Sequence, residues 1–180
     1  MSVRVVLAVI LVVAFCSVSY PAIEDARTTR AEHHAAGELA TVENALLDLS
    51  TETTVSMGHP GARRVVTLSI PHESTSTARI EFVAIGGVPE SGHEREKDAH
   101  GDVLAYRAGG ETHVRHVPFD LRVARAGGQK RDHDWHLETD RTPLVVRDTG
   151  RTEIAFRLVE RRGKRLVLVT PIDESPSSTA

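Results

Sequence analysis

The chain has 180 residues, enough for one folded domain beside an apolar N-terminal segment. Its 22 basic and 25 acidic residues leave a net charge of −3 without a basic stripe, which argues against nucleic acid as a partner. Aromatic residues make up only 4% of the chain, so a surface that stacks sugars or bases is not expected, and the single Cys16 excludes an intrachain disulfide.

The first predicted element is the uncharged run Val5–Ile23. As a helix it would span roughly 28 Å, close to the roughly 30 Å hydrocarbon core of a bilayer. We therefore predict that residues 1–23 form a transmembrane signal anchor, which would make this a single-pass protein of the cell membrane with its C-terminal domain outside. The alternative is a cleaved secretory signal, with Ser17 and Ser19 as the small residues before a cut at Tyr20.

The second predicted element is an amphipathic helix over residues 24–50, with a start or a bend at Pro21. Apolar residues then recur at steps of four and three, which is the spacing of one helix face. This face consists of Ala35, Leu39, Val42, Leu46 and Leu49. Two interpretations remain open: the face contacts a partner protein as in a coiled coil, or it packs on the domain that follows. Residues 51–62 are expected to be a linker.

From residue 63 to residue 172 the apolar pattern changes to period two, which predicts an antiparallel β domain. We expect seven or eight short strands, two of them joined by a hairpin at Gly109-Gly110 and the last two by a hairpin at Gly163. The expected strands are Arg63–Ile70, Arg79–Ile85, Asp102–Arg107, Thr112–Val117, Phe119–Arg125, Leu144–Arg147, Thr152–Glu160 and Arg165–Pro171. The fold class is therefore α+β, with a β sandwich or a curved sheet of about seven strands, and residues 173–180 are expected to be a disordered tail.

Ten histidines raise the question of a metal ion. The densest group is Asp132-His133-Asp134-Trp135-His136, but two histidines three residues apart point to opposite faces of a strand, as His113 and His116 also would. No metalloprotease motif, paired cysteines or nucleophile elbow is present. We therefore predict no metal, no cofactor and no catalytic residue. A metal-dependent hydrolase built on His133, Asp134 and His136 is the enzymatic alternative.

The order of an apolar anchor, a proline, an amphipathic helix and a β domain resembles the layout of type IV pilins and pseudopilins. More narrowly, the segments VRVVLAVILVVAF, YPAIEDAR, PGARRVVTLSIP and AIGG resemble an uncharacterised haloarchaeal family of small proteins with an N-terminal membrane anchor. That family is associated with archaeal type IV pilus and secretion gene clusters. The resemblance covers most of the chain and implies protein partners in such an assembly, besides membrane lipid around the N-terminal helix.

Two features separate the chain from a polymerising pilin. Pilin precursors carry a charged leader with a processing site and a glutamate shortly after it, whereas Ser2-Val3-Arg4 supplies no such site and no acid lies within Val5–Ile23. The resemblance thus implies a non-enzymatic accessory or structural component that acts through protein–protein contacts. The alternative is a secreted β-sandwich binding module released by cleavage of the signal.

Overall fold

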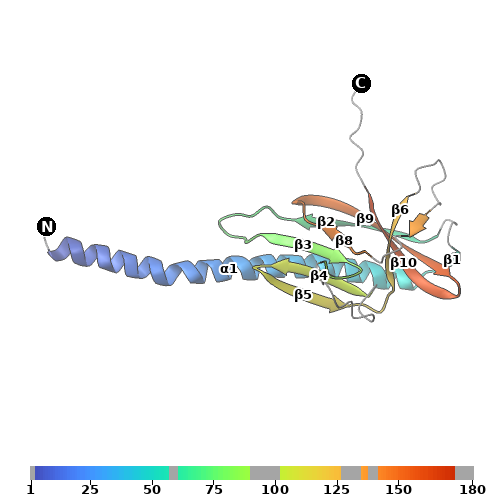
Figure 1. Cartoon of the computed structure of the whole chain (residues 1–180), viewed down its shortest axis with the longest axis horizontal. Helices are drawn as coiled ribbons and strands as arrows, with labels where there is room; N and C mark the ends of the chain where they lie inside the picture. The colour runs from blue at the N-terminus through green and yellow to red at the C-terminus, as the bar shows by residue number, and fades with distance from the viewer. Residues whose placement is uncertain (1–2, 57–60, 90–101, 127–134, 138–141, 173–180) are drawn as a thin grey trace, which may run out of the picture.

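The computed structural model describes residues 3–56, 61–89, 102–126, 135–137 and 142–172, which form one long helix and ten strands. Figure 1 shows the helix running out from a β domain toward the N-terminus. The elements are α1 (Val3–Ser50), β1 (Val55–Ser56), β2 (Arg63–Ile70), β3 (Ile80–Ile85), β4 (Val103–Ala108), β5 (Glu111–His116), β6 (Leu121–Ala126), β7 (Trp135–Leu137), β8 (Leu144–Val146), β9 (Gly150–Arg161) and β10 (Lys164–Ile172).

Helix α1 unites the two helical elements that the sequence predicted. It continues through Pro21 without a break, so this residue neither begins nor ends a helix. The apolar side chains before Glu24, among them Leu7, Val12 and Phe15, are exposed. This half is long and apolar enough to cross a membrane, and none of its most apolar 18-residue segment is buried.

The strands form two sheets. One has the order β1-β9-β10-β6-β7 with β2 also paired to β9, and the other has the order β5-β4-β3-β8. The prediction of a purely antiparallel domain is wrong, because β1 pairs with β9 and β10 pairs with β6 in parallel. The number of strands also exceeds the prediction: β1 lies within the expected linker, and β7 lies in a segment where no strand was expected. The expected tail, residues 173–180, lies outside the described residues.

The hairpin β9–β10 is the longest antiparallel pairing, from Lys164 opposite Arg161 to Ile172 opposite Glu153. Its turn has two central residues, Arg162 with φ of 53° and Gly163 with φ of 75°. Positive φ at both central positions matches the right-handed twist of the paired strands, so the tight turn fixes their register. The hairpin predicted from the sequence is confirmed.

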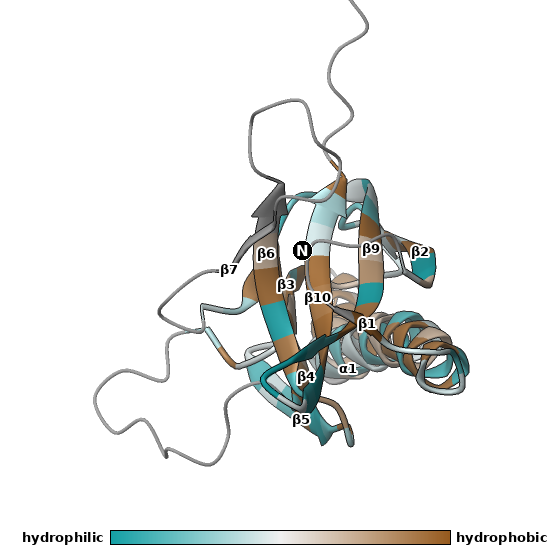
Figure 2. Ribbon diagram, turned by 90° about the vertical axis from the view of Figure 1, so that its right-hand side faces the viewer, coloured by the Kyte–Doolittle hydropathy of each residue, from teal (hydrophilic) through white to brown (hydrophobic). Residues whose placement is uncertain are grey.

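A shared core joins α1 to both sheets. Ala35 and Leu46 of the helix pack in the same buried cluster as Leu68 of β2, Leu104 of β4 and Phe156 of β9. Figure 2, which looks along α1, shows the helix beside strands of the two sheets. Because one apolar cluster crosses all three elements, the C-terminal half of the helix is part of the β domain and not an appendage to it.

Gly109 lies where the β4–β5 turn touches the helix. Its φ of 59° belongs to the left-handed region, and a Cβ at this position would overlap the Cγ2 atom of Thr28. Gly110 has a φ of 82°, but a Cβ there would meet open space. We expect Gly109→Ala to destabilise the domain by about 1–3 kcal/mol more than Gly110→Ala, because overpacking adds to a backbone strain that both variants share.

Thermal unfolding of the two glycine variants in detergent micelles measures this difference. The double variant Gly109→Ala/Thr28→Ala should recover most of it, because the shorter side chain removes the overlap. Equal melting temperatures for the two single variants would show that the turn moves freely away from the helix.

Candidate functional site

The helix face proposed as a partner contact lies inside the chain. All five of its residues are at most 2% exposed and belong to the shared core: Ala35, Leu39, Val42, Leu46 and Leu49. The intrachain interpretation left open by the sequence therefore describes this face. Another protein has no access to it unless the domain opens.

Polar side chains along the neighbouring stripe of α1 connect the helix to the edge strand β5. Glu43 accepts a hydrogen bond of 2.8 Å from the guanidinium of Arg115. One Oε atom of Glu32 lies 3.5 Å from Nε2 of His113. Since Arg115 and His113 are two residues apart, they project from the same face of the strand toward the helix.

A second connection between α1 and the sheets lies nearer the apolar half. Arg27 donates hydrogen bonds to the carbonyl oxygen of Ser74 and contacts the carboxylates of Glu24 and Glu73. The backbone N–H of Ala78 donates to the carbonyl oxygen of Arg27. The segment between β2 and β3 is thus tied to the helix less than two turns after the uncharged run ends.

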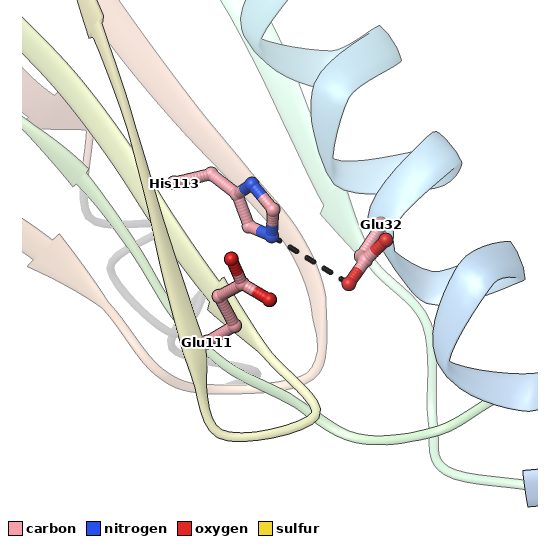
Figure 3. Close-up of side chains that lie close together, drawn as sticks. All are labelled: Glu32, Glu111 and His113. Carbon is pink, nitrogen blue, oxygen red and sulfur yellow. Dashed lines mark ion pairs between the residues drawn. The ribbon is translucent and has the colours of Figure 1, made fainter. Parts of the chain in front are cut away.

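Glu32, Glu111 and His113 form the most concentrated group of potential ligands among the described residues. One nitrogen or oxygen atom of each lies within 4.8 Å of the other two. Figure 3 shows the imidazole of His113 directed at Glu32 across the gap between β5 and α1, with the Glu111 carboxylate beside them. The His113 Nε2 atom is buried and has no hydrogen-bond partner within the described part of the chain.

Tyr106 of β4 fixes the orientation of this imidazole. It lies directly opposite His113 in the antiparallel register, and the two rings stack with centroids 4.7 Å apart and planes 15° from parallel. Burial raises the pKa of the Tyr106 phenol; the charge of Glu32 also raises it, that of Arg115 lowers it and that of Glu111 raises it. Burial and two nearby carboxylates therefore favour the neutral phenol at this site.

A hollow of about 210 Å³ adjoins the cluster. Its lining includes the rings of His113 and Tyr106, the side chain of Arg115, and the apolar residues Ala36 and Leu39 of the helix. This volume accommodates several water molecules next to the imidazole.

This cluster was not identified from the sequence, although the spacing of two of its three residues was visible there. Glu111 and His113 are two residues apart, a spacing that places both on one face of a strand. Glu32 lies far away in the chain, and only the docking of α1 brings it to them. For the group predicted as the enzymatic alternative, His133 and Asp134 lie outside the described residues, and only the backbone of His136 is described, in β7.

Comparison with known proteins identifies a family and nothing more specific. No curated protein and no solved structure matches the chain. The profile of a family described as a domain of unknown function, DUF7311, matches residues 2–172. This range includes the apolar half of α1 and all the strands of the described residues, so the apolar helix and the β domain belong to one family unit. The chain is therefore a member of the DUF7311 family.

Proposed function

We propose that the protein is a membrane-anchored, non-enzymatic component of a type IV pilus-like or secretion assembly, with its β domain on the outer side of the membrane. The observation that carries this proposal is the division of a single helix between two environments. Its first half is apolar and exposed, and one face of its second half is buried in the core of the β domain. A protein with this construction holds its domain at a fixed position on the membrane surface.

The same division supports the pilin-like layout as a basis for the proposal. In that layout an apolar helix extends from a β domain and contacts membrane lipid or neighbouring subunits. Exposed large apolar side chains of the described residues are concentrated in the first half of α1. In the rest of the described chain only Leu47, Val65 and Val114 are of this kind. The helix is thus the surface with most to gain from burial in a larger assembly.

The continuity of α1 favours an anchor over a cleaved signal. Ser17 and Ser19 lie inside the helix, and the Ser17 hydroxyl donates a hydrogen bond of 2.8 Å to the carbonyl oxygen of Val13. A protease needs an extended backbone at the bond that it cuts, so the helix would have to unwind around Tyr20 before cleavage. The secreted binding module remains the second candidate and makes a distinct prediction for the N-terminus.

The proposal is tested in a haloarchaeal host, the source that the sequence resemblance implies. The gene is deleted, and pili on the cells and proteins in the medium are counted with and without a tagged copy of the full chain. Photo-crosslinkers are placed at Phe15 in the apolar helix and at Val65 on β2. We expect the deletion to reduce piliation or secretion and at least one position to crosslink to a subunit of that machine.

Two results would decide against this function. Unchanged piliation and secretion in the deletion strain would show that the protein is not a component of a pilus-like or secretion assembly. An intact mass that starts at Tyr20, with the product in the medium, would replace the anchor by the secreted module. A full-length mass in the membrane fraction is the result that we expect.

A further inference from the structure

We propose that Glu32, Glu111 and His113 bind a divalent transition-metal ion such as Zn²⁺ and that the ion fastens helix α1 to strand β5. This site is independent of the proposed assembly function. None of its three residues belongs to the group His133, Asp134 and His136 that the sequence singled out. The inference starts from the geometry of the three side chains and from the unused imidazole nitrogen.

The separations of the ligand atoms suit a small metal ion. At bond lengths of about 2.0–2.1 Å, neighbouring ligands of a tetrahedral zinc ion lie roughly 3.3 Å apart. The His113 Nε2 and Glu32 Oε1 atoms are already 3.5 Å apart. Glu111 is exposed and lies within the 4.8 Å limit of the cluster, so a rotation of its side chain brings its carboxylate to the same ion.

The imidazole of His113 has the restrained ring and the free, directed nitrogen atom that a metal ligand requires. Its stacking on Tyr106 restrains the ring, while Nε2 points at Glu32 and is without a hydrogen-bond partner among the described residues. A buried nitrogen of this kind is satisfied by a carboxylate, by a water molecule or by a metal ion, and only a metal ion would join it to both carboxylates at once. The distance of 3.5 Å to Glu32 is long for a hydrogen bond, whereas a metal ion between the two atoms satisfies both.

Charge and chemistry favour a dication that accepts nitrogen. Two carboxylates and a neutral imidazole carry a charge of −2, which the ion balances. Arg115, on the same face of the strand, forms its ion pair with Glu43 at 2.8 Å and not with the carboxylates of the cluster. Imidazole selects zinc and related transition ions over Ca²⁺ and Mg²⁺, which prefer oxygen ligands, and the adjoining hollow of about 210 Å³ has space for the water that completes the coordination.

The position of the site gives the ion a mechanical role. Glu32 lies roughly 14 Å along the helix beyond Ile23, the end of the uncharged run. An ion shared by α1 and β5 would clamp the membrane-proximal part of the β domain to the helix that enters the membrane. Metal binding would then stabilise the docked helix, because the unfolded chain does not hold the three ligands together.

The test is calorimetric titration of the full chain in detergent micelles with Zn²⁺ alone, and separately with Ca²⁺. We expect one strong Zn²⁺ site and Ca²⁺ binding weaker by at least about tenfold. His113→Ala should abolish the site, and Glu111→Gln should weaken it by at least about tenfold. Glu111 is an exposed residue, so this variant leaves the fold intact and separates loss of a ligand from loss of structure.

Two control variants test whether Zn²⁺ binds at Glu32, Glu111 and His113 and not at other histidines. His116→Ala removes an imidazole from the opposite face of the same strand, and His133→Ala/His136→Ala removes the group predicted from the sequence; both should retain the site. Zinc should raise the melting temperature of the parent and of both controls, and not that of His113→Ala. Absence of a strong Zn²⁺ site, its retention in His113→Ala, its loss in His133→Ala/His136→Ala, or equal affinity for Ca²⁺ would each overturn the proposal.

Discussion

Leu46→Ala is expected to lower the free energy of unfolding of the β domain by about 2–5 kcal/mol. Leu46 is 0% exposed and lies in the cluster that α1 shares with both sheets. Truncation would remove buried methyl groups and leave a cavity that the helix cannot close without shifting against β2 and β4. The measurement is thermal or denaturant unfolding in detergent micelles, followed by circular dichroism of the strands.

Leu47→Ala is the matched control for this prediction. It removes the same atoms from the next residue of the same helix, but Leu47 is 46% exposed. We expect Leu47→Ala to lower the free energy of unfolding by less than about 1 kcal/mol, as substitutions at surface positions generally do. Equal losses for the two variants would mean that the helix does not pack in the domain core in solution.

Val12→Arg/Val13→Arg is expected to release the protein from the membrane fraction. Both residues are exposed near the centre of the uncharged run, and each arginine there costs about 2.5–3.5 kcal/mol on the insertion scale. Together the two charges offset much of the gain from placing the other apolar side chains in lipid. The measurement is the tagged protein that stays in the membrane pellet after alkaline extraction.

Thr29→Arg/His33→Arg is the control, with the same two arginines placed on exposed positions of the same helix beyond the run. We expect full retention in the pellet, because these positions lie outside the hydrocarbon. If the first pair also leaves the protein in the pellet after alkaline extraction, the two arginines do not prevent insertion of the uncharged run, and the prediction is wrong.

The strands that the sequence located are those with a clear period of two. The predicted strand Arg63–Ile70 has the bounds of β2, and its alternating residues Val66, Leu68 and Ile70 are buried as expected. In β3 the alternation was less informative, because Val83 and Phe82 are both buried, on opposite faces. A strand covered on both sides carries apolar residues on both faces, so periodicity does not show which face meets the core that contains α1.

The parallel pairings were beyond the reach of sequence patterns. Strand β1 has only Val55 and Ser56, which is too short to show any period. The partners β6 and β10 are separated by three other strands in the chain, and no turn joins them. The ligand cluster was missed for the same reason, because Glu32 reaches His113 only through tertiary packing.

The hairpin β9–β10 occupies the middle of its sheet although it is the last part of the domain to be synthesised. Strand β9 pairs with β1, β2 and β10, and β10 also pairs with β6. Until Gly150–Ile172 has emerged, β1 and β2 have no partner strand in the described part of the chain and β6 has only β7. The apolar face of α1 then has no complete core to cover. During biosynthesis the apolar half of α1 therefore leaves the ribosome long before the domain can close, and a truncation that removes β10 would leave the rest of the domain open.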